Sequence, residues 1–97
     1  MTAPKFVPNT GCDVAPALVR TILAEYKKLL PQIERAKAFV FADKTERTSV
    51  QIVFSETFDN YPEIVWFDID VVLKRPRVLV TCFEQDTDAE TTMGVIE

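Results

Sequence analysis

IVWFDIDVVLKRPRVLVTCFE, residues 64–84, is the stretch of sequence that decides the fold. Apolar and polar side chains alternate along both ends of this stretch, a pattern typical of β-strands with one buried face. The polar run at residues 74–77, which contains a proline, predicts a turn between the two ends. We therefore expect a β-hairpin made of strands 64–73 and 78–84.

The alternation divides this hairpin into two unequal faces. Pairing Leu73 with Val78 across the turn gives one face that is wholly apolar, made of Phe67, Ile69, Val71, Leu73, Val78, Val80 and Cys82. The other face mixes aromatic, aliphatic and acidic residues, namely Trp66, Asp68, Asp70, Val72, Leu79, Thr81 and Phe83. A slip of one residue would bury two aspartates at a large cost in free energy, so the assignment of faces is well specified.

The rest of the chain predicts one helix and a second, shorter hairpin. Apolar residues recur at helical spacing over residues 14–36, with Asp13 as the expected N-cap and a kink near Pro31. Two short runs of β-favouring residues, 38–42 and 49–55, flank a polar turn. The prediction is an α+β fold in which one long amphipathic helix packs on one face of a three- to four-stranded antiparallel meander.

The length of 97 residues predicts a single domain, 1–97, because one hydrophobic core suits chains of roughly 100–150 residues. Prolines and a glycine in residues 1–12 predict an extended leader, and the polar, acidic residues 85–97 predict a tail that frays. With no membrane-spanning apolar run and no signal-peptide pattern, we expect a cytoplasmic protein that binds no membrane. Cys12 and Cys82 suggest neither a disulfide framework nor a metal site.

The charged residues restrict the possible chemistry. The chain has no histidine, which excludes Ser-His-Asp triads and histidine-based zinc sites. Residues 1–55 carry eight basic and five acidic side chains, whereas residues 56–97 carry three basic and ten acidic ones. An acidic half disfavours direct binding to nucleic-acid phosphates. No glycine-rich phosphate loop or calcium-binding loop is present, and we expect no cofactor.

The mixed face of the 64–84 hairpin is the candidate functional surface. Exposed apolar patches of this kind are typical of protein-binding surfaces, and tryptophan is enriched at binding hot spots. The alternative is that the leader or the tail covers this face. The candidate partner-binding residues are Trp66, Asp68, Asp70, Leu79, Phe83, Glu84, Asp86 and Asp88.

Three functions agree with these patterns. The first is a non-enzymatic inhibitor whose carboxylates occupy a basic nucleic-acid-binding surface of a protein partner, in the manner of DNA mimics and phage anti-CRISPR proteins. The second is a structural or assembly subunit that forms homodimers or larger assemblies through its exposed sheet face. The third is a divalent-cation-dependent enzyme, because Asp68 and Asp70 lie at i and i+2 of one strand and can share a cation.

Overall fold

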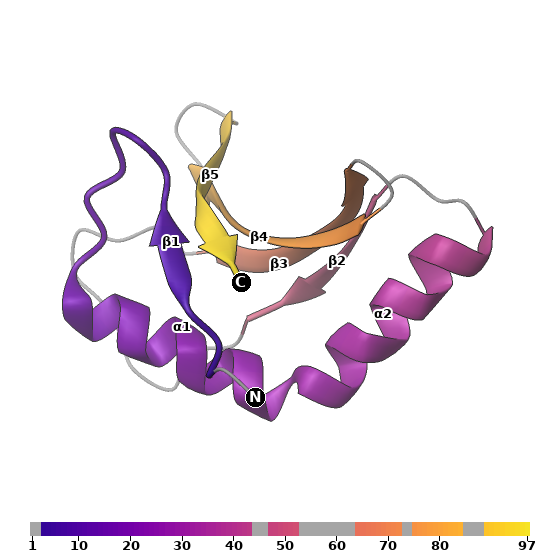
Figure 1. Ribbon diagram of the computed structural model, residues 1–97. Coiled ribbons are helices and arrows are strands. Elements are labelled where there is room, and N and C mark those ends of the chain that lie inside the picture. The colour runs from indigo at the N-terminus through magenta and orange to yellow at the C-terminus, as the bar shows by residue number, and fades with distance from the viewer. Residues whose placement is uncertain (1–2, 44–46, 53–63, 73–74, 85–88) are drawn as a thin grey trace.

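The computed structural model describes residues 3–43, 47–52, 64–72, 75–84 and 89–97. Its elements, in chain order, are β1 (Phe6–Pro8), α1 (Pro16–Lys28), α2 (Leu30–Asp43), β2 (Arg47–Gln51), β3 (Ile64–Val72), β4 (Arg75–Glu84) and β5 (Ala89–Ile96). The strands form one antiparallel sheet in the order β1-β5-β4-β3-β2, and both helices lie on the same side of it (Figure 1). The fold is therefore α+β, with two helices and a five-stranded antiparallel sheet.

Two helices stand where the sequence predicts one, because Pro31 interrupts the helical pattern. Proline lacks an N–H, and its ring disfavours helical backbone in the residue before it. α1 therefore ends at Lys28, and α2 begins at Leu30 with the proline in its first turn, where a missing N–H does no harm. α1 begins at Pro16 without a side-chain cap, so the predicted cap by Asp13 is wrong. Neither helix combines the length and the apolar character needed to cross a membrane, as far as the chain is described.

Residues 38–42 continue α2, so the prediction of a strand there is wrong. Phe39, Val40 and Phe41 favour strands by propensity, which is worth at most about 1 kcal/mol. However, Ile33 and Val40 lie two helical turns apart and are fully buried in the core. Burying this helical face outweighs the local preference and leaves both phenylalanines half exposed on its flanks. β2 is shorter than the predicted strand 49–55 and begins two residues before it. With no strand at 38–42 to pair with, β2 pairs with β3.

The central hairpin keeps its predicted faces but not its predicted register. Val78 pairs with Ile69 rather than with Leu73, and the ladder extends to a pair between Val72 and Arg75. The predicted turn at 74–77 is therefore wrong, because a longer ladder satisfies more main-chain groups. The observed partner of Val78 lies four residues from the predicted one. Because side chains alternate between the two faces, a shift by an even number of residues leaves every described side chain on its predicted face.

Both ends of the chain contribute strands that local patterning does not reveal. β1, from the predicted leader 1–12, pairs with β5, which forms most of the tail that was expected to fray. Lys5 and Glu97 donate main-chain hydrogen bonds to one another at 2.9 Å. Phe6 and Ile96 are opposite each other in this ladder and both are buried, which explains why the two ends are held in the sheet.

The core lies between the helices and one face of the sheet. α1 contributes Leu18, Ile22 and Tyr26, and the ring of Tyr26 packs edge to face on Phe67 of β3, with centroids 5.7 Å apart. The apolar face predicted from the hairpin is the face that meets the helices. The opposite face, called the outer face below, is covered by no described helix (Figure 1).

Gly94 permits the close approach of β1 to β5. A Cβ at this position would lie 2.5 Å from the Phe6 ring and 2.5 Å from the main-chain oxygen of Val7. We expect Gly94→Ala to lower the free energy of unfolding by about 2 kcal/mol, because a buried ring and a strand backbone must both move. Denaturant titration measures this change. The control Thr91→Ala, an exposed change in β5, should stay within about 0.5 kcal/mol of the parent, and an equal effect of the two substitutions would contradict the packing of β1.

Candidate functional site

The outer face combines partly exposed apolar side chains with one buried charge. The strand registers align Val7, Val95, Leu79, Asp68 and Ser49 in a row across all five strands. The two valines and the leucine are half buried, whereas Asp68 is only 2% exposed. A carboxylate that is so far removed from water requires partners.

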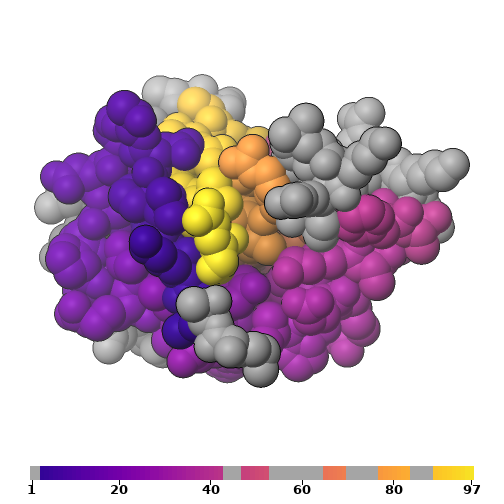
Figure 2. Space-filling view, in the orientation of Figure 1, coloured from indigo at the N-terminus to yellow at the C-terminus, as the bar shows by residue number. Residues whose placement is uncertain are grey.

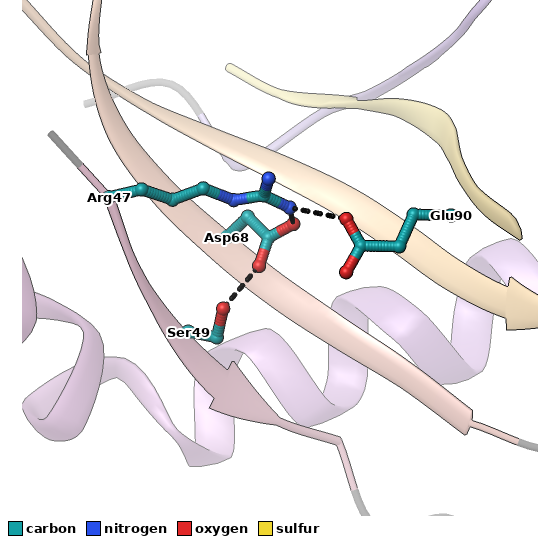
Figure 3. Close-up of polar contacts among 4 residues, drawn as sticks. All are labelled: Arg47, Ser49, Asp68 and Glu90. Carbon is teal, nitrogen blue, oxygen red and sulfur yellow. Dashed lines mark hydrogen bonds and ion pairs between the residues drawn. The ribbon is translucent and has the colours of Figure 1, made fainter. Parts of the chain in front are cut away.

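Two side chains of β2 satisfy Asp68. The Arg47 guanidinium donates a hydrogen bond through Nη2 to Asp68 Oδ2, and the Ser49 hydroxyl donates to Oδ1 at 2.5 Å (Figure 3). Each carboxylate oxygen therefore accepts a hydrogen bond, which offsets the cost of burying the charge. The hydrogen bond to Asp68 raises the pKa of Arg47 and so favours its charged form further.

The reach of Arg47 shows that the outer face is concave. Its Nη2 also lies 3.4 Å from Glu90 Oε2. Arg47 is on β2 and Glu90 is on β5, with β3 and β4 between them. The registers place Arg47 opposite Asp70 but Glu90 opposite Phe83, which pairs with Ile64, so the two residues are also displaced along the strands. In a flat sheet their backbones would lie more than about 20 Å apart, beyond the reach of the two side chains, so the contact requires a sheet that twists and curves toward its outer face. Figure 1 shows β3 and β4 bowed in this sense, with the helices on the convex side.

An aromatic pair lies beside this ionic contact. The rings of Trp66 and Phe83 pack edge to face, with centroids 6.2 Å apart and an interplanar angle of 82°. Both rings are partly exposed. Thr81, which is opposite Trp66 in the β3–β4 ladder, has a buried hydroxyl with no hydrogen-bond partner among the described residues. The aromatic pair therefore adjoins a buried polar group that no described residue bonds.

The structure brings one group of the predicted partner-binding residues together on the outer face, namely Trp66, Asp68, Leu79 and Phe83. Asp68 faces Arg47 and Ser49 rather than solvent, so its charge is used within the protein. The side chains of Asp70 and Glu84, and the whole of Asp86 and Asp88, lie outside the described part of the structure.

Sequence reasoning does not single out Arg47, Ser49 or Glu90. Arg47 falls in a predicted polar turn and Glu90 in a predicted tail. Alternation along β2 would place Arg47 and Ser49 on one face, but the pairing of β2 with β3 is needed to put them over Asp68.

The described residues include no group of three or more His, Cys, Asp or Glu side chains placed to hold a metal ion. A divalent cation at Asp68 would have to displace Arg47. Cys12 and Cys82, both described, form no disulfide bond, and the Cys12 thiol lies 3.6 Å from the main-chain oxygen of Thr92.

Comparisons with known proteins identify no relative of this chain. No protein-family model, no curated protein and no solved structure matches it.

Removing Arg47 tests how much the buried charge matters. We expect Arg47→Met to lower the free energy of unfolding by about 2–4 kcal/mol, because Asp68 is left buried without its cation. Adding Asp68→Asn should recover part of this loss, since a neutral amide needs no counter-charge. The control Lys37→Met removes an exposed ion pair with Glu34 and should cost about 0.5 kcal/mol or less in the same denaturant titration. A loss from Arg47→Met no larger than that of the control would contradict this role.

The unpartnered hydroxyl of Thr81 gives an opposite prediction. Thr81→Val should raise the free energy of unfolding by about 1 kcal/mol, because it removes a buried polar group that bonds to no described residue. Thr92→Val is the control, since Thr92 is opposite Thr81 in the β4–β5 ladder but only half buried. Calorimetric melting of the two variants measures the difference, and a Thr81→Val protein less stable than the parent would show that the hydroxyl is bonded.

Proposed function

We propose that the protein is a non-enzymatic binding module whose outer face docks on another protein. The observation that carries this proposal is that Trp66, Leu79 and Phe83 are partly exposed on a concave sheet face that no described helix covers. Aromatic residues of this kind are the usual anchors of protein interfaces, because they bury a large area with little loss of conformational freedom. The edge-to-face contact between the two rings orders both of them before any partner binds.

The partner that we propose carries a basic, nucleic-acid-binding surface. Residues 56–97 supply β3, β4 and β5 and have a net charge of −7, with three basic and ten acidic side chains. One guanidinium, that of Arg47, faces the two carboxylates of Asp68 and Glu90, so this cluster keeps a net negative charge, and its exposed carboxylate is Glu90. A surface that attracts phosphates also attracts such carboxylates. The protein would then act as an inhibitor that competes with nucleic acid, in the manner of a DNA mimic.

The experiment begins with affinity capture from a native lysate and identification of the bound proteins by mass spectrometry. Capture alone does not support the proposal, so the affinity of the purified partner is measured next. We expect duplex DNA or RNA to displace the protein, and added salt to weaken the complex. Leu79→Ala and Glu90→Lys should each weaken binding by about tenfold or more, because they remove an apolar anchor and reverse a charge on the outer face.

The matched control is Glu34→Lys, the same charge reversal on an exposed position of α2. It should leave the affinity unchanged, because the helices lie on the other side of the sheet. Folding of each variant is checked by circular dichroism before binding is measured. The proposal would be refuted if the parent, Leu79→Ala and Glu90→Lys proteins bound with equal affinity. It would also be refuted if neither nucleic acid nor salt weakened binding.

A further inference from the structure

The open edge of β2 carries main-chain groups that no described strand uses. Ile52 N–H donates to the Val65 carbonyl at 3.0 Å, which identifies these two residues as a hydrogen-bonded pair of the β2–β3 ladder. In an antiparallel ladder such pairs alternate with non-bonded ones. The N–H and C=O groups of Arg47, Ser49 and Gln51 therefore point away from β3, toward the edge at which the sheet ends among the described residues.

The other edge of the sheet is blocked. Lys5 and Glu97 exchange hydrogen bonds, and Asn9 N–H donates to the Met93 carbonyl at 2.9 Å, so the odd-numbered residues of this segment face β5. The even-numbered positions face outward, and Pro4 and Pro8 occupy two of them without an N–H to offer. A short, proline-flanked strand is a recognised protection against pairing with another chain. β2 contains no proline and no bulge, so the two edges differ in whether they admit another strand.

The helix that packs against β2 exposes two large apolar side chains. Phe39 and Phe41 of α2 are 51% and 47% exposed, and α2 lies against β2 and at the surface of the molecule (Figure 2). Thr48 and Val50, whose side chains point from β2 toward the helices, are only half buried. A further strand beside β2 would bring its own inward side chains over this incompletely covered surface.

We propose that two copies of this chain form a two-fold symmetric dimer by antiparallel pairing of β2 with β2, with Ser49 opposite Ser49. Centring the pair on Ser49 matches Arg47 with Gln51 of the second copy and uses every outward-facing group of β2. No like charges then stand directly opposite one another.

The distribution of charge favours a second copy as the occupant of this edge. Residues 30–52, which supply α2 and β2, carry four basic and three acidic side chains, whereas residues 56–97 have a net charge of −7. Two copies that meet at β2 therefore join their nearly neutral segments. The outer faces stay on the same side of one continuous sheet and remain open to a partner.

Sedimentation velocity and light scattering over a range of concentrations test the dimer. The parent protein should show twice the 11.0 kDa mass of the chain and dissociate on dilution. Gln51→Pro should be monomeric, because it removes an outward N–H at a position that makes no hydrogen bond to β3. Gln51→Ala is the matched control, since it changes the same side chain but keeps the N–H, and it should remain dimeric.

Amide hydrogen exchange of the parent protein gives a readout that needs no variant. In the dimer, the amides of Arg47, Ser49 and Gln51 should be protected at high concentration and exchange at least tenfold faster on dilution. The amides of Thr48 and Val50, which are bonded to β3, should be protected in both conditions and serve as internal controls. A monomeric mass at all concentrations, a dimeric Gln51→Pro protein, or fast exchange of the three edge amides in the dimer would overturn the proposal.

Discussion

The buried charge of Asp68 is the constraint on which the register and curvature of the sheet depend. An unpaired carboxylate at this depth would cost several kcal/mol, so β2 must lie where Arg47 and Ser49 reach both of its oxygens. A slip of one residue in the β2–β3 ladder would turn both donors toward the helices and leave Asp68 without partners. The contact between Arg47 and Glu90 extends this constraint across the concave face to β5. One ionic cluster therefore holds β2 in register with β3 and joins β2 to β5 across the concave face.

The sequence predicts the faces of the sheet better than its register, and the reason is physical. Alternation with a period of two residues assigns Trp66 and Phe67 to opposite faces whatever their exact partners are, because only an odd displacement exchanges the faces. The partner of Val78 depends instead on the position of the turn between β3 and β4. The local pattern of polar and apolar residues specifies that position only weakly. The prediction of a strand at residues 38–42 is wrong for the converse reason. Their strand propensity is local, whereas the burial of Val40 beside Ile33 in the core is a tertiary effect that the propensity does not contain.

The same distinction separates the parts of the candidate site that the sequence reveals from those that it hides. Trp66, Leu79 and Phe83 belong to one hairpin, so alternation alone brings them to one face. Arg47 and Glu90 come from β2 and β5, and their contact over Asp68 exists only because the sheet is curved. No local signal reports a curvature of this kind. The acidic excess of residues 56–97, in contrast, is a count of charges that needs no structure.

Arg47 connects the outer face with the open edge of β2. Its side chain lies over Asp68 and Glu90, while its main-chain N–H and C=O point away from β3. A strand added at this edge would fix the backbone from which the guanidinium extends, and so restrict the side chains that border the outer face. On the proposed dimer, the interface between copies and the border of the binding face therefore share one strand. Two outer faces held on the same side of a continuous sheet would engage a repetitive basic surface with an avidity that neither face has alone.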